Sequence, residues 1–133
     1  MNRKTLKLIF ILFVAAAIVS SCNAISSKRV GCVCTNIGNE MNCRYKLFSD
    51  QETDRIKVES GETLEISYDV EVESGELRIS LLNPDEEVVW EKDFMEAASD
   101  TATYQANEDG KLILIVEGVD TEGLFNISWQ VME

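Results

Sequence analysis

Apolar and polar residues alternate along most of the chain after residue 44. This period of two is typical of β-strands with one buried and one exposed face. The clearest example is 64–72, where five apolar residues are separated by four polar ones. Residues 112–116 are apolar at every position, which predicts a central strand covered on both faces. Shorter stretches of the same kind predict further strands at 45–48, 55–58, 77–81, 88–94, 101–106 and 125–131.

Turn-forming residues separate these strands. Residues 73–75 (Glu-Ser-Gly) predict one turn, and 83–85 (Asn-Pro-Asp) place proline at the second position of a type I turn. Polar stretches that end in Gly110 and Gly123 predict turns before the last two strands. Strands at intervals of about ten residues predict an all-β fold, an antiparallel β-sandwich or jelly roll of about 7–8 strands. Residues 94–99 have room for one helical turn.

The N-terminus follows a different pattern. A basic start precedes an unbroken apolar run at 8–19, and Ser20, Ser21 and Cys22 come soon after it. About a dozen apolar residues are too few to cross a bilayer as a helix, which takes about 20, but they match the centre of a secretory signal. The order resembles a bacterial lipoprotein signal peptide. That resemblance implies a signal-peptide helix at 1–21, removed on export, and acyl chains such as palmitate on Cys22.

Two other processing sites compete with Cys22. Ordinary secretion would place the cut after Ala24, because Cys22-Asn23-Ala24 loosely imitates a small-residue cleavage site. A later motif ends at Cys32, but there Arg29 occupies the position that requires an aliphatic residue. We expect lipidation at Cys22, and therefore a protein held at the extracytoplasmic face of the cell membrane by its lipid anchor.

The amino-acid composition excludes several classes of function. The chain has 12 basic and 24 acidic residues, a net charge of -12, and no histidine. Loss of Arg3, Lys4 and Lys7 with the signal would leave 9 basic and 24 acidic residues, or -15. A surface this acidic repels nucleic acid. Without histidine, Ser-His-Asp and Cys-His catalysis is impossible, so we expect a protein that is not an enzyme and has no cofactor.

The segment 22–43 lacks clear periodicity and contains many Ser, Asn and Gly residues. We therefore expect a flexible tether there, followed by one β-sandwich domain at 44–133. Lys28 and Arg29 would place the base of the tether against anionic lipid headgroups, or would simply be solvated.

Three cysteines follow the expected lipidation site. Cys32 and Cys34 are too close together to pair comfortably, so Cys43 would form a disulfide with one of them. The alternative is that all three are free thiols. A metal site built from Cys32, Cys34 and Cys43 would lack the usual two-residue spacing and a fourth ligand, so we expect no bound metal.

Two further features have competing interpretations. Acidic loops at 85–87, 108–109 and 120–122 would bind calcium only if their oxygens converged, and otherwise form turns. Trp90 and Trp129 occupy inward positions of their strands and are expected in the core. The alternative is an exposed platform on which a sugar ring stacks.

Two segments, 61–70 and 118–129, carry a family likeness, together with the Asn-Pro-Asp turn at 83–85 and Val88-Val89-Trp90 after it. They resemble small β-sandwich lipoproteins of Gram-positive bacteria. More distantly, they are similar to pre-peptidase C-terminal domains and Golgi-dynamics domains. Relatives often have glycine after the Pro-Asp pair, where this chain has Glu86.

The resemblance implies binding or chaperoning rather than catalysis. We therefore expect a membrane-anchored extracytoplasmic lipoprotein whose β-sandwich binds a protein, a peptide or an envelope polymer. The alternatives are a structural or stress-related envelope protein without a specific ligand, a secreted carbohydrate-binding module, and an enzyme that uses paired carboxylates.

Overall fold

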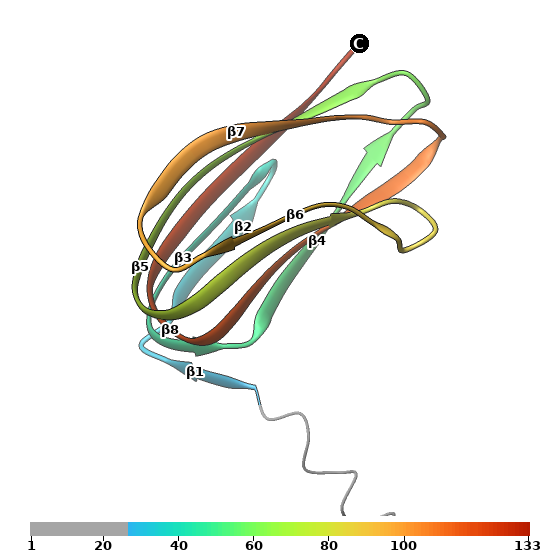
Figure 1. Ribbon diagram of the computed structural model, residues 1–133. Coiled ribbons are helices and arrows are strands. Elements are labelled where there is room, and N and C mark those ends of the chain that lie inside the picture. The colour runs from blue at the N-terminus through green and yellow to red at the C-terminus, as the bar shows by residue number, and fades with distance from the viewer. Residues whose placement is uncertain (1–26) are drawn as a thin grey trace, which may run out of the picture.

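The computed structural model describes residues 27–133, and these residues form eight β-strands (Figure 1). The strands are β1 (Lys28–Val30), β2 (Val33–Ile37), β3 (Glu40–Ser49), β4 (Gln51–Val58), β5 (Thr63–Leu82), β6 (Val88–Phe94), β7 (Ala98–Gln105) and β8 (Gly110–Met132). The expected signal peptide and Cys22 lie outside the described residues. Within 27–133 there is no helix that is long and apolar enough to cross a membrane. The expected all-β class is confirmed, and no helical turn forms at 94–99.

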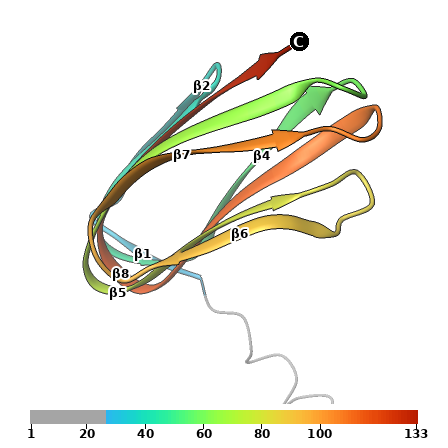
Figure 2. The same ribbon diagram turned by 45° about the horizontal axis from the view of Figure 1, so that its top comes forward.

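Two long strands, β5 and β8, are paired over nearly their whole lengths, and each bends near its middle (Figures 1 and 2). The bends fold one antiparallel sheet over on itself into two layers. Layer A consists of β2, β3, the second half of β8, the first half of β5, and β7. Layer B consists of β4, the first half of β8, the second half of β5, and β6. β1 pairs with the end of β3.

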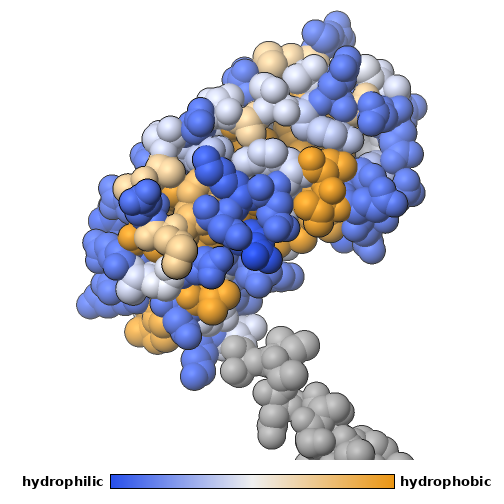
Figure 3. All heavy atoms as spheres, in the orientation of Figure 1, coloured by the Kyte–Doolittle hydropathy of each residue, from blue (hydrophilic) through white to orange (hydrophobic). Residues whose placement is uncertain are grey.

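The core lies between the layers and is filled by alternate residues of each strand. Tyr68 is 4% exposed, and its ring meets those of Phe94 and Trp90, with centroids 5.2 and 6.1 Å apart. Trp129 is 7% exposed, as the alternation predicts, whereas Trp90 is half-buried at the edge of the core. Figure 3 shows a mostly hydrophilic face with apolar residues visible in places between the polar ones.

The strand at 112–116 was expected to be covered on both faces, but it is fully covered on only one. Leu112, Leu114 and Val116 are buried in the core, but Ile113 and Ile115 lie half-buried on the outer face of layer B. No further layer covers that face within the described part of the chain, so neighbouring side chains give the two isoleucines partial cover.

Two expected turns are wrong. Residues 73–75 and 120–123 do not reverse the chain but lie at the bends inside β5 and β8, so two pairs of expected strands are two continuous strands. The physical reason is the register of the pair, which shifts between Val72 and Glu76 opposite β8. Gly123 has φ +147, and a Cβ there would collide with the carbonyl oxygen of Glu71. Glycine is therefore required for close contact between two bending strands rather than for a chain reversal.

The expected tether at 22–43 is also wrong from Lys28 onward, because β1, β2 and the start of β3 occupy this segment. β2 and β3 form a hairpin with Gly38 and Asn39 at its tip, and Ile37 pairs with Glu40. Every residue of β2 is exposed, which explains why no alternation marks it in the sequence. The sheet thus begins well before the expected boundary at residue 44.

The Asn-Pro-Asp turn is confirmed. The Glu86 amide donates to the Asn83 carbonyl oxygen at 2.9 Å, which closes a four-residue turn with Pro84 at its second position. Glu86 has φ 63, the left-handed conformation that glycine adopts more readily. The departure from the family pattern at Glu86 therefore falls at a position where the backbone favours glycine.

Gly123→Ala is expected to destabilise the domain by about 1–3 kcal/mol more than Gly61→Ala, because a backbone oxygen blocks the new methyl group. Both glycines have positive φ, but a Cβ at Gly61 meets no atom within 4 Å. The two variants thus share backbone strain and differ in the steric collision. Urea unfolding of both proteins measures the difference, and equal losses of stability would show that the bend does not need a glycine.

Candidate functional site

The outer face of layer A carries a polar groove of about 470 Å³. Because side chains alternate across each strand, four strands contribute polar residues to this face in two rows. The first row runs Asn42, Asn126, Asp69, Ser99 and the second runs Glu40, Ser128, Ser67, Thr101, each residue directly opposite the next. Both rows line the groove.

A smaller hollow of about 250 Å³ continues the groove along the same face. It is lined by Glu65, Trp129, Gln130 and the two serines of the second row, Ser67 and Ser128. Gln130 Nε2 donates to Glu65 Oε1 at 3.0 Å. The polar surface therefore extends beyond the two rows, along the direction of β5 and β8.

Most of the groove's hydrogen-bonding groups are available. Ser67 Oγ and Thr101 Oγ1 lie 3.4 Å apart and can share one hydrogen bond. Among residues 27–133, no side-chain hydrogen bond engages Asn42, Asn126 or Asp69. The groove thus presents amide donors and acceptors next to carboxylate and hydroxyl groups, without strong internal pairing.

Aromatic side chains do not take part in this surface. Tyr68 and Trp129 belong to its lining strands, but both direct their rings into the core and are almost fully buried. Trp90 lies on β6 in the other layer, half-buried near Tyr68. The alternative of an exposed tryptophan platform for sugar stacking is therefore not supported.

The acidic loops that might have bound calcium have local structural roles instead. Asp109 accepts a hydrogen bond from the Ser60 amide at 2.7 Å, and Asp120 accepts one from the Ser49 hydroxyl at 2.9 Å. Glu87 Oε2 accepts a hydrogen bond from the Asn83 amide at 3.3 Å. Within the described range, no three of these loop carboxylates converge as metal ligands would.

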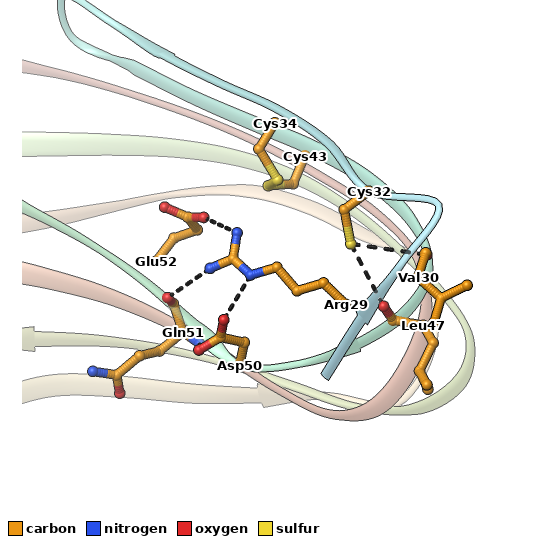
Figure 4. Close-up of a disulfide and its surroundings, with 9 residues drawn as sticks. All are labelled: Arg29, Val30, Cys32, Cys34, Cys43, Leu47, Asp50, Gln51 and Glu52. Carbon is orange, nitrogen blue, oxygen red and sulfur yellow. Dashed lines mark hydrogen bonds and ion pairs between the residues drawn. A yellow bond between two sulfur atoms is a disulfide. The ribbon is translucent and has the colours of Figure 1, made fainter. Parts of the chain in front are cut away.

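A disulfide joins Cys34 on β2 to Cys43 on β3, and Cys32 remains a half-buried thiol (Figure 4). The pairing follows from the hairpin register, which places Cys34 directly opposite Cys43. Cys32 Sγ lies 3.5 Å from the Leu47 carbonyl oxygen, to which its thiol can donate. The sequence left open whether Cys43 pairs with Cys32 or Cys34, or whether all three thiols are free. In the structure, Cys43 forms its disulfide with Cys34.

Arg29 closes the side of the sandwich next to this disulfide. Its guanidinium group binds Asp50 at 2.6 Å, Glu52, and the Gln51 carbonyl oxygen at 3.2 Å (Figure 4). The guanidinium carbon also lies 5.2 Å from the centroid of the Phe48 ring. The expected contact of Arg29 with lipid headgroups does not fit this arrangement, because the carboxylates of Asp50 and Glu52 already engage the side chain.

Charge and burial shift the pKa values of two groups here. The hydrogen bond from Arg29 holds the pKa of Asp50 below its ordinary value. Burial raises the pKa of Tyr45 to about 12, and the neighbouring Thr121 hydroxyl offsets part of that effect. Neither the Tyr45 nor the Thr121 hydroxyl has a partner with hydrogen-bond geometry. Such unpaired buried hydroxyls lower the stability of the core beside the bend.

These features define an antiparallel β-sandwich domain with a polar groove on one face. The fold is similar to part of the secreted serine protease VesC from Vibrio cholerae, with a TM-score of 0.51 and 12% identity over 73% of this chain and 21% of the protease chain.

More distant matches include a carbohydrate-binding module (CBM6cm-2) from Cellvibrio mixtus lichenase 5A, with a TM-score of 0.46, 13% identity, and 81% of this chain and 89% of that chain covered. The pre-peptidase C-terminal domain of a Bacillus anthracis collagenase has a TM-score of 0.46 and 16% identity over 61% and 77% of the two chains. At these identities the likeness concerns the fold alone. No protein-family model matches the sequence, and no curated protein matches it.

The Arg29–Asp50 ion pair should make stability depend on pH. Because the folded-state pKa of Asp50 is lowered, the pair stabilises the fold above the unfolded-state pKa of about 3.9. That contribution disappears as the pH falls through the lower folded-state value. The difference in unfolding free energy between wild type and Arg29→Gln should therefore shrink between about pH 7 and about pH 2.

Urea unfolding at several pH values measures this difference. Arg55→Gln is the matched control, because Arg55 is exposed and makes no ion pair within 27–133. A difference for Arg29→Gln that stays constant over the whole pH range would mean that the ion pair contributes nothing.

Proposed function

We propose that this protein is a lipid-anchored extracytoplasmic binding protein whose β-sandwich holds a hydroxyl-rich envelope polymer, such as a polysaccharide, in the layer A groove. The single observation that carries the proposal is the pair of polar rows across four strands. Such rows repeat donors and acceptors at the strand spacing of about 4.8 Å. A polymer with repeated hydroxyl groups can engage several of them at once.

The chemistry of the rows favours vicinal hydroxyl groups. The amides of Asn42 and Asn126 can each donate and accept, and the Asp69 carboxylate accepts two hydrogen bonds. Each net hydrogen bond contributes only about 0.5–1.5 kcal/mol, and the groove offers no aromatic ring for stacking. Affinity for one sugar unit is therefore modest, and repeated contacts along a polymer supply the rest.

The charge of the groove favours neutral or basic ligands over acidic ones. Glu40, Asp69 and Asp100 line it, and no Lys or Arg does. Carboxylates at this density repel a polyanionic chain. The groove is also an open sheet face that does not exclude water, which suits binding better than carboxylate catalysis.

The distribution of charge supports an orientation toward the membrane. Residues 27–49 contain Lys28, Arg29, Arg44 and Lys46 but only one acidic residue, Glu40, a net charge of +3. Residues 50–133 contain the other 23 acidic residues and five basic ones, a net charge of -18. An anionic membrane repels this larger part and tolerates the N-terminal end.

The proposed anchor lies close to the sheet. Five residues separate Cys22 from Lys28, the first residue of β1, and the distance between these two residues is at most about 20 Å when the chain is fully extended. Acyl chains on Cys22 would therefore hold the sandwich beside the bilayer. An envelope polymer at the membrane surface would be within reach of the groove.

The double variant Asn42→Ala/Asn126→Ala is expected to weaken polymer binding by about fivefold or more, since it removes hydrogen bonds worth about 1–3 kcal/mol together. Affinity electrophoresis in gels containing neutral envelope polysaccharide measures the effect. Asn107→Ala, in an exposed loop away from the groove, is the matched control and should migrate as the wild type does.

Equal retardation of the double variant and the wild type would contradict a role for the groove. If the wild type binds none of the neutral or basic polymers in this assay, the alternative of an envelope protein without a specific ligand is favoured.

Mass spectrometry of the membrane fraction is expected to show a mature chain that begins at Cys22 with at least two acyl chains, because one chain anchors only weakly. Cys22→Ser should release the protein from membranes, whereas Cys32→Ser should leave it bound. An unmodified chain that begins at Ile25 would disprove the lipid anchor. It would not affect the groove proposal, which the Asn42→Ala/Asn126→Ala experiment tests separately.

A further inference from the structure

A second candidate site lies at the β2–β3 edge of layer A, on the inner face of that layer and next to Glu52 of β4 in layer B. Sulfur atoms of Cys34 and Cys43 and a carboxylate oxygen of Glu52 all lie within 4.8 Å of one another. Cys34 and Cys43 come from the β2–β3 hairpin, and Glu52 comes from β4. The disulfide holds the two sulfurs together, and the ion pair with Arg29 holds Glu52 close to them.

We propose that, after reduction of the Cys34–Cys43 disulfide, the two thiolates and the Glu52 carboxylate bind a thiophilic divalent cation such as Zn²⁺. Cysteine thiolates and carboxylates are both zinc ligands, and tetrahedral sites hold them about 3.3–3.8 Å apart. In the oxidised protein the two sulfurs are bonded to each other, and the Glu52 oxygen lies within 4.8 Å of both. After reduction, side-chain rotation within the paired hairpin would separate the sulfurs and place the three groups at three of four positions, and solvent would supply the fourth.

Access and charge support the site. Cys34 lies on a strand that is exposed at every residue, so a reductant can reach the disulfide, while Cys43 is only 2% exposed. Arg29 holds one oxygen of Glu52 and thereby fixes the carboxylate beside the sulfurs (Figure 4). The second oxygen of Glu52 remains available to a metal ion. Two thiolates and one carboxylate would more than neutralise a divalent cation, and Arg29 balances the remaining charge.

Metal binding requires two steps, reduction of the disulfide and then loss of the two thiol protons. A dithiol reductant transfers two electrons and two protons, the Cys34–Cys43 bond breaks to give two thiols, and the reductant becomes a disulfide. When the cation binds, each thiol releases its proton to solvent and forms a metal–sulfur bond. Thiol–disulfide exchange with an oxidised dithiol reverses the reduction: the oxidised dithiol takes up two electrons, the Cys34–Cys43 bond forms again, and the cation is released to solvent. The metal site and the disulfide are therefore mutually exclusive.

Cobalt(II) is a spectroscopic probe for such a site, because tetrahedral cobalt with thiolate ligands absorbs strongly in the visible and near ultraviolet. The experiment uses the whole chain in detergent with Cys22→Ser, so that only three thiols remain. The reduced protein is expected to bind one equivalent of Co²⁺, which Zn²⁺ displaces. The oxidised protein should show no such absorption.

Variants assign the ligands. Glu52→Gln should weaken Co²⁺ binding by about tenfold or more and leave the disulfide able to form. Asp54→Asn is the matched control on the same face of β4 and should bind as the parent does. Cys34→Ser/Cys43→Ser should abolish the absorption, with circular dichroism to confirm that the strands remain.

The proposal would be overturned by no absorption from the reduced parent, by undiminished absorption from the double cysteine variant, or by unchanged affinity of Glu52→Gln. Loss of binding in Cys32→Ser would also overturn it, because that thiol lies outside the proposed ligand set.

Discussion

The whole structure depends on the pairing of β5 with β8. These two strands run through both layers, so every other strand is attached, directly or through one neighbour, to the same central pair. Because β5 and β8 bend at the same level, their shared bend sets the distance between layer A and layer B. The core residues of each layer face each other only because the bend places them there, and glycine at position 123 permits the strands to approach closely enough.

This constraint explains which features the sequence predicts and which it does not. Every strand expected from alternation overlaps an observed strand, because alternation reports directly on burial across a sheet. β2 was missed because an edge strand exposed at every residue leaves no such pattern. A polar stretch containing glycine looks the same in a turn and in a bend. Only the partner strand distinguishes them, and the sequence does not reveal pairing.

The functional surfaces were harder to predict than the fold. The groove is built from polar residues on four strands, and each taken alone is an ordinary exposed position such as Ser67 or Asn126. Their alignment follows from register, which no local pattern encodes. The partners of Arg29 are likewise 21 and 23 residues away in the sequence. The three cysteines were recognised, but the choice of Cys34 over Cys32 needed the hairpin register.

Under the proposed anchor at Cys22, the hairpin disulfide would have a mechanical consequence. Tension from that end enters the sheet at Lys28 and acts first on the three residue pairs that join β1 to β3. These pairs, with the Arg29 contacts, would open one after another. The load then reaches β2, where Cys34 is covalently joined to Cys43 after a single residue pair. The disulfide would therefore limit strand separation to β1 and the first residue of β2. The core between the two layers would stay intact under this tension.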